Sequence, residues 1–117
     1  MPEPMPTFEQ GDVIKVPFPY TDRATRQSRP ALVVSTARLE ELHGLLWVAM
    51  ITSAENRGWP DDVPVADLTR AGLPVPSLIR CAKIATIDAS HASRLGRVSE
   101  DQVALVTGQL VRALTAA

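Results

Sequence analysis

Hydrophobic and polar residues alternate along residues 12–18, and this period of two is typical of a β-strand with one buried face. Pro17 in this stretch lacks a backbone N–H, so we expect the strand to lie at a sheet edge or to end in a bulge. Residues 78–88 alternate as well, although neither face is cleanly polar. The two stretches predict two strands.

Two uninterrupted apolar runs predict buried strands. The first covers residues 30–35 and is opened by Pro30, where a missing N–H is harmless to a strand. The second, residues 45–52, is apolar on both alternating faces, as expected of a central strand or of one covered by a partner subunit. A homodimer is therefore one expectation from this run. A further short strand is expected at residues 62–65.

The helical signals are short until the C-terminal end. Residues 37–44 predict one or two helical turns and residues 66–71 predict one turn, each ended by a glycine. Ser99 as N-cap with Gln102 three residues later predicts a capping box at the start of a longer helix. The apolar positions of that helix recur at helical spacing. They are Val103, Val106, Leu110, Val111 and Leu114.

Several short strands followed by one amphipathic helix predict a mainly β fold with some α structure. We expect a small twisted sheet or half-barrel with the C-terminal helix packed across it. Residues 1–10, which are rich in proline, are expected to form an arm that stays loose or packs as an extended strand. Residues 11–117 are expected to form a single domain, since 117 residues suit one core.

Composition excludes several classes of protein. With 45% hydrophobic residues and a net charge of −1, the chain is neither disordered nor suited to coat nucleic acid broadly, although a small basic site is compatible with it. No apolar run approaches the roughly 20 residues of a membrane helix. The single cysteine, Cys81, excludes an internal disulfide and favours the cytoplasm, and we expect it to be an inert core thiol.

Metal and cofactor chemistry find no support in the residue spacing. His43 and His91 are far apart, and no CxxC or HExxH motif occurs. The glycines never form GxGxxG or GxxxxGK, and there is no GxSxG nucleophile elbow. We therefore expect neither a metal ion nor a nucleotide cofactor.

Positive charge collects in the polar stretch 19–28 and just after it. Arg23, Arg26 and Arg29 make this region a candidate anion site, with a solvated loop as the simpler alternative. Arg29 precedes Pro30, which favours an extended backbone and a fixed side chain. In the same way Thr52, the first polar residue after an apolar run, is either a site residue or an ordinary threonine at a strand end.

Five segments occur in an order that resembles the MazF/PemK toxin family. They are GDVIKVPFPYTD from Gly11, SRPALVVS from Ser28, MITSA from Met50, SLIRCAKIATID from Ser77 and LGRVSEDQVALVTGQLVRAL from Leu95. The similarity runs over nearly the whole chain, to about residue 114. It implies a small SH3-like barrel, or twisted antiparallel sheet, with a C-terminal helix. It also implies a toxin of a type II toxin-antitoxin system that forms homodimers. Such a toxin would cleave single-stranded RNA sequence-specifically and without a metal, through attack of the substrate 2′-OH.

The resemblance also implies site residues. Arg29 and Thr52 match the family's arginine and strand-end threonine, and Arg80 matches the arginine of the VRCD segment that PemK-like members carry. The carboxylate of that segment is replaced by Ala82, which leaves the general base open. Substitutes within the chain are Asp22, His43 and Asp88. RNA would be bound by Tyr20, Arg23, Arg26, Ser53 and Trp59, because single-stranded RNA is held by stacking and phosphate contacts.

The resemblance further implies a cognate antitoxin, whose disordered segment would cover the RNA groove and the loops. Two other functions stay open. Gyrase poisons of the CcdB type share the fold, so the chain could inhibit a topoisomerase without being an enzyme. The absent carboxylate at Ala82 is instead the best argument for an RNA-binding module with weak or no catalysis.

Overall fold

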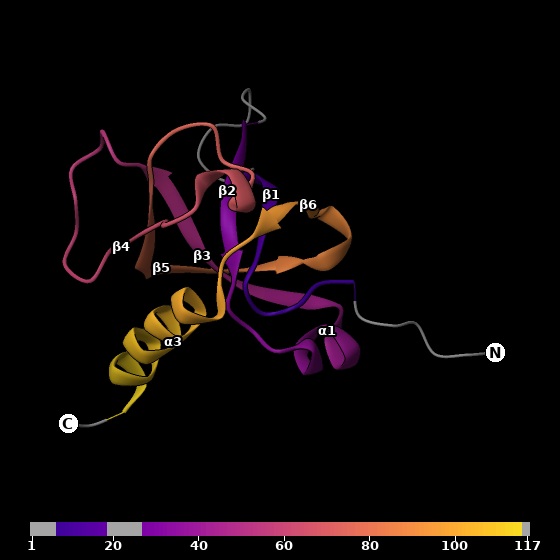
Figure 1. Ribbon diagram of the computed structural model, residues 1–117. Coiled ribbons are helices and arrows are strands. Elements are labelled where there is room, and N and C mark those ends of the chain that lie inside the picture. The colour runs from indigo at the N-terminus through magenta and orange to yellow at the C-terminus, as the bar shows by residue number, and fades with distance from the viewer. Residues whose placement is uncertain (1–6, 19–26, 116–117) are drawn as a thin grey trace.

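The computed structural model describes residues 7–18 and 27–115 (Figure 1). The strands are β1 (Asp12–Phe18), β2 (Gln27–Val33), β3 (Leu45–Ser53), β4 (Val63–Pro64), β5 (Ser77–Asp88) and β6 (Ser93–Arg97). The helices are α1 (Ala37–His43), α2 (Leu68–Ala71), the short 3-10 helix η1 (Ala89–His91) and α3 (Glu100–Leu114). Gly44 and Gly72 end α1 and α2 in the left-handed conformation, as the sequence predicts.

The strands form one antiparallel sheet in the order β4-β5-β3-β2-β1-β6. Its register breaks once between β3 and β5, where Ala49 stands opposite Ile84 but Met50 stands opposite Arg80. A second break lies in β1 at Val13, opposite β6. Because such bulges bend and twist a strand, the sheet curls into a half-barrel. With the C-terminal helix, this confirms the predicted fold class.

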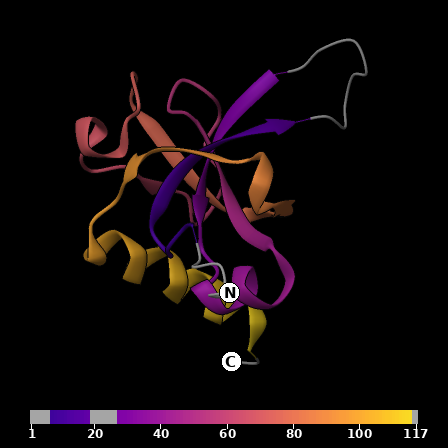
Figure 2. The same ribbon diagram turned by 90° about the vertical axis from the view of Figure 1, so that its right-hand side faces the viewer.

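Each face of the curled sheet carries its own hydrophobic cluster. One cluster includes Leu32, Ala49 and Ile79, and it is covered by α2 and by the first turns of α3 through Val106. The other includes Ala31 and residues of β1 and β3, and it is closed by Phe8 and by alanines near η1. Figures 1 and 2 both place α1 and α3 at the same end of the sheet.

The doubly apolar run 45–52 becomes a central strand whose two faces are buried within one chain. Val48 and Met50 belong to one cluster, and Ala49 and Ile51 belong to the other. Trp47 is the exception, with 49% of its surface exposed. Burial within the chain therefore accounts for most of the pattern that suggested a partner subunit, and the homodimer stays a prediction.

The second strand is displaced from its predicted bounds of 30–35. It begins at Gln27 and ends at Val33, because β1 and β2 form a hairpin whose ladder continues outward past the proline. Pro30 is tolerated inside the strand because pairing with β3 starts only at Ala31. Pro17 was expected at a sheet edge, and this is confirmed: β6 pairs with β1 only as far as Lys15, so β1 is an edge strand at Pro17.

Helix α3 begins as predicted, but half of its capping box is wrong. The Ser99 hydroxyl accepts a hydrogen bond from the N–H of Gln102 at 3.3 Å. The Gln102 side chain does not return to Ser99; it accepts from the N–H of Ala66 and donates to the carbonyl of Pro64. The buried Gln102 satisfies one backbone group in the edge strand β4 and one just after it, so a tertiary contact replaces the local one.

Part of the predicted N-terminal arm packs onto the fold. Phe8 is buried, and the N–H groups of Thr7 and Phe8 donate to the Glu40 carboxylate of α1. Residues 1–6 lie outside the described residues. Within the described ranges, no helix is long and apolar enough to cross a membrane.

Candidate active site

Arg29, Thr52 and Arg80 lie on one face of the sheet, on three adjacent strands. Met50 of β3 stands opposite Ala31 of β2 and opposite Arg80 of β5, and opposed residues in antiparallel strands share a face. Arg29 is two residues from Ala31, and Thr52 is two residues from Met50, so both join the same face. The structure thus sets these three side chains on the same face of adjacent strands, and we call them the polar stripe.

Arg80 is held by the loop between β3 and β4. Its Nε donates to Oδ1 of Asp62 at 3.3 Å, and its Nη2 donates to Oδ2 of Asp62 at 3.1 Å and to the carbonyl of Arg57 at 2.8 Å. The side chains of Arg80 and Asp62 are only 11% and 7% exposed. The two-pronged contact between a guanidinium and a carboxylate fixes both groups in one plane.

Trp59 of the same loop covers the face of this guanidinium. The guanidinium carbon of Arg80 lies 4.2 Å from the centre of the Trp59 ring, a cation–π distance. The Trp59 backbone N–H donates to Oδ2 of Asp62 at 2.8 Å, which ties the aromatic residue to the ion pair. Trp59 is still 44% exposed, so part of its ring is open to solvent.

The Asp62 carboxyl is held in its ionised form. Burial alone would raise its pKa, but hydrogen bonds from Arg80 and from the Trp59 N–H, together with the charge of Arg80, outweigh burial and lower the pKa below its usual value. A carboxylate with a lowered pKa is a weak proton acceptor near neutral pH. Asp62 therefore fits the role of a counter-ion better than that of a general base.

Thr52 is also held by the β3–β4 loop. The Asn56 side-chain amide donates to the Thr52 hydroxyl oxygen at 2.6 Å, which leaves the hydroxyl proton of the half-buried Thr52 free to be donated elsewhere. Ser53 is one residue further and therefore faces the opposite side of the sheet. Its hydroxyl oxygen accepts from the N–H of Glu55 at 3.2 Å, so the structure does not bring Ser53 to the polar stripe.

Arg29 is the exposed member of the stripe. It stands opposite Val16 within β2, rather than at the mouth of the strand. The other candidates of the first polar stretch, Tyr20, Arg23 and Arg26, lie outside the described residues. Their part in RNA binding stays a prediction.

Neither of the two proposed substitutes that the structure describes, His43 and Asp88, is found beside Arg80. Ala82 is exposed on β5, and Asp88 pairs with Leu45 at the far end of β3 from Thr52. His43 lies near the same far end, and Asp22 is outside the described residues. The hydroxyl and N–H of Ser90 also lower the pKa of Asp88, which makes it a weaker base.

Asp62 is the site residue that sequence reasoning missed. It precedes β4, in which Val63 stands opposite Ile79, so one further step of the ladder sets Asp62 opposite Arg80. The only signal in the sequence was the pair of acidic residues after Trp59-Pro60. Cys81, by contrast, is buried as predicted, and burial raises the pKa of its thiol.

Comparison with known proteins identifies the family. The model of the PemK-like, MazF-like toxins of type II toxin-antitoxin systems matches residues 9–114. The chain belongs to this family. No curated protein matches the chain in sequence.

Solved structures of PemK/MazF relatives share the fold. A crystal structure of MazF from Deinococcus radiodurans is 27% identical, with a TM-score of 0.71, and the match covers 91% of this chain and 94% of that one. A MazE-MazF structure from the same organism is 25% identical, with a TM-score of 0.74 and coverages of 93% and 97%. An endoribonuclease in complex with its cognate antitoxin from mycobacterial species is 17% identical, with a TM-score of 0.68 and coverages of 97% and 95%.

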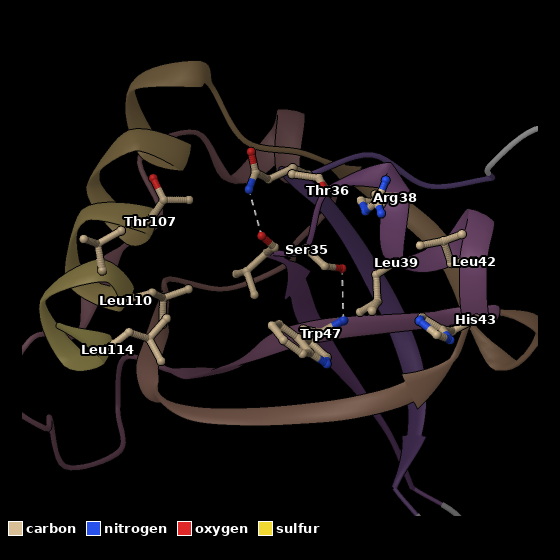
Figure 3. A pocket seen from close by; sticks show the side chains of 13 residues that line it. Ser35, Thr36, Arg38, Leu39, Leu42, His43, Trp47, Thr107, Leu110 and Leu114 are labelled. Carbon is tan, nitrogen blue, oxygen red and sulfur yellow. Dashed lines mark hydrogen bonds between the residues drawn. The ribbon is translucent and has the colours of Figure 1, made fainter.

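This PemK/MazF family member also has an apolar groove of about 470 Å³ between α1 and α3 (Figure 3). Trp47 forms its floor, Leu39 and Leu42 line the α1 side, and Leu110 and Leu114 line the α3 side. Trp47 alternates with Val48 and Met50, so it faces away from the side of the sheet that carries the polar stripe. The groove and the polar stripe are therefore separate surfaces.

Proposed function

We propose that this toxin is an endoribonuclease that cleaves single-stranded RNA without a metal ion. The 2′-OH of a ribose attacks the adjacent phosphorus, the bond from phosphorus to the 5′-oxygen breaks, and a 2′,3′-cyclic phosphate forms. The 2′-OH proton leaves to a base, and the departing 5′-oxygen takes up a proton. The observation that carries the proposal is the polar stripe, which groups Arg29, Thr52 and Arg80 on one face.

Each member of the polar stripe has a role suited to its chemistry. The exposed guanidinium of Arg29 stabilises the charge that develops on the phosphate. The Thr52 hydroxyl donates to a non-bridging oxygen, since Asn56 already occupies its acceptor side. Arg80 donates to the phosphate or to the leaving 5′-oxygen, but a guanidinium carries only N–H donors and no acceptor, so it does not serve as the base.

RNA binding outside the stripe falls to the two loops. Trp59 has an exposed part of its ring on which a base can stack, and Tyr20, Arg23 and Arg26 would add stacking and phosphate contacts from the first polar stretch. Ser53 is the weakest of these candidates, because its hydroxyl is engaged within its own turn.

The partners follow from the family. Relatives of this fold have been crystallised as MazE-MazF and as an endoribonuclease with its cognate antitoxin. We infer that this chain likewise has a cognate antitoxin, whose disordered segment covers the RNA groove and the loops, and that it forms a homodimer. A monomeric mass at micromolar concentration would refute the dimer.

A second candidate function is an RNA-binding module without catalysis. Two observations favour it: Ala82 stands where related toxins carry a carboxylate, and the carboxyl of Asp62, which pairs with Arg80, has a lowered pKa. Such a module would bind RNA through the same stripe and leave it intact.

The test is to incubate the purified protein with a long single-stranded RNA in EDTA and to map the new ends. We expect discrete cuts at a short repeated motif, bearing 2′,3′-cyclic phosphate. Arg29→Ala should lower cleavage by about 100-fold or more, the cost of losing one donor to a developing oxyanion. Arg38→Ala, which removes an exposed arginine of α1 at the groove, is the matched control and should cleave normally.

Other outcomes of this experiment point elsewhere. Tight RNA binding without cutting would favour the binding module. Neither cutting nor binding would favour a topoisomerase inhibitor of the CcdB type. Unchanged cleavage by Arg29→Ala would remove Arg29 from the mechanism.

A further inference from the structure

The β3–β4 loop brings the carboxylate of Asp62 to Arg80, a member of the polar stripe. We propose that Asp62 is a positioning residue that holds the Arg80 guanidinium with its Nη1 edge toward the RNA phosphate. This inference rests on the proposed ribonuclease function.

In the part of the chain that the structure describes, the hydrogen bonds of Arg80 come from Nε and Nη2 only. Asp62 takes the edge formed by Nε and Nη2, and the carbonyl of Arg57 takes a further Nη2 hydrogen. Among the described residues, no acceptor is hydrogen-bonded to Nη1. A guanidinium has five N–H donors, and none of the described residues uses the two on Nη1.

Packing removes the remaining freedom of this group. Trp59 covers one face of the guanidinium at 4.2 Å, and the side chain of Arg80 is 11% exposed. A free arginine on a strand would populate many rotamers and would lose that entropy when it stabilises the reacting phosphate in the transition state. Asp62 and Trp59 fix the side chain beforehand, so the RNA does not have to order it.

The negative charge of Asp62 does not cancel the attraction between the ordered Arg80 guanidinium and the RNA phosphate. The carboxylate sits on the edge of the guanidinium opposite to Nη1, so a phosphate at Nη1 is closer to the positive group than to the negative one. Because the interaction between charges falls with distance, attraction exceeds repulsion there. A carboxylate that is already paired with arginine is also a poor base, which separates this role from general-base catalysis.

Asp62→Asn is the main test, measured with an RNA oligonucleotide that carries the mapped cut site. The amide cannot accept both guanidinium bonds, so Arg80 is released while the size of the side chain is kept. We expect kcat to fall by up to about 100-fold, the range for misplacing a reacting group by about 1 Å, with KM nearly unchanged. Asp61→Asn is the matched control: it removes the same charge from the neighbouring residue, at a left-handed position that asparagine tolerates, and should leave kcat unchanged.

A double variant separates positioning from a general loosening of the loop. If Asp62 acts only through Arg80, then Asp62→Asn adds no further loss of kcat to Arg80→Ala. An additive loss in the double variant, or an unchanged kcat in Asp62→Asn, would overturn the proposal. If Asp62→Asn does not fold, Asp62→Glu keeps the charge but moves it by about one bond length, roughly 1.5 Å, and should lower kcat with KM unchanged.

The nuclear magnetic resonance signal of the Arg80 side chain tests the positioning without any cleavage. In the wild type, the Nε–H signal and distinct Nη–H signals should be visible because rotation is restricted, and both should be lost in Asp62→Asn. Signals that survive in Asp62→Asn would overturn the proposal even if the wild type proved inactive. An inactive wild type with signals lost in the variant would refute the ribonuclease function and leave Asp62 as the residue that orders Arg80.

Discussion

This molecule has two clusters of aspartate and arginine, and they differ in which of the two residue types lies at the buried centre. In the first, Asp12 of β1 is fully buried and accepts from Arg94 at 2.6 Å and from Arg97 at 2.7 Å, while the two arginine side chains are 50% and 37% exposed. In the second, Arg80 is the buried hub, and its partner Asp62 comes from a loop.

The difference indicates what each cluster does. Both oxygens of Asp12 are used within the fold, and one of them also accepts from the N–H of Glu9, so this cluster joins the N-terminal segment to β1 and β6. The hub of the second cluster instead keeps a donor edge, at Nη1, that no hydrogen bond within the described residues uses. A buried acid with all its acceptors filled stabilises the fold, whereas a buried arginine with spare donors can bind an anion.

The largest expected effect is the loss of the first cluster. Asp12→Ala leaves two arginines without their carboxylate and should lower the free energy of unfolding by roughly 3 kcal/mol, at the low end for breaking a buried ion pair because both arginines can reach water. Urea unfolding measures this change. The exposed Glu55→Ala is the control and should stay within about 0.5 kcal/mol of the wild type. If Asp12→Ala lowered the free energy of unfolding only slightly, the Asp12 cluster would not be the one that stabilises the fold.

A smaller effect should separate the second cluster by its function. Trp59→Leu removes a stacking surface and should weaken binding of an uncleavable 2′-O-methyl RNA by roughly 1–3 kcal/mol, with little loss of stability. Fluorescence anisotropy at fixed salt measures the affinity. Trp47→Leu is the matched control, since Trp47 is similarly exposed but lies in the apolar groove. Equal weakening by both variants would refute base stacking on Trp59.

The smallest effect is a pH dependence of stability that belongs to Asp62. Because its folded pKa lies below the unfolded value of about 3.9, the ionised Asp62 stabilises the fold above that value, and this contribution is lost as pH falls through the folded pKa. The difference in Tm between the wild type and Asp62→Asn should therefore be constant from pH 7 to about pH 5 and shrink below about pH 4. A difference that grows on acidification would contradict the lowered pKa.

Much of the candidate site was predictable from the sequence, and the rest was not for a definite reason. Arg29, Thr52 and Arg80 were found through motifs that persist in order along the chain, and strand alternation then sets them on one face. Asp62 was missed because its importance depends on the register between β4 and β5, which no local pattern encodes. The loop residue Asn56 was missed for a similar reason, since its bond to Thr52 depends on how the turn closes.

The sequence by itself determined strands β1, β3 and β5, the left-handed glycine ends at Gly44 and Gly72, and the N-cap of α3 at Ser99, because these depend on residues within a few positions of one another. It did not predict β6, and it placed the start of β2 three residues too far along the chain. Tertiary structure decided which polar groups meet. The Gln102 side chain is hydrogen-bonded to the backbone beside β4 instead of to Ser99. Asp12 pairs with arginines more than 80 residues away, and Asp62 pairs with Arg80. Such pairings form because a buried polar group must find a partner, and the folded sheet determines which partner is within reach.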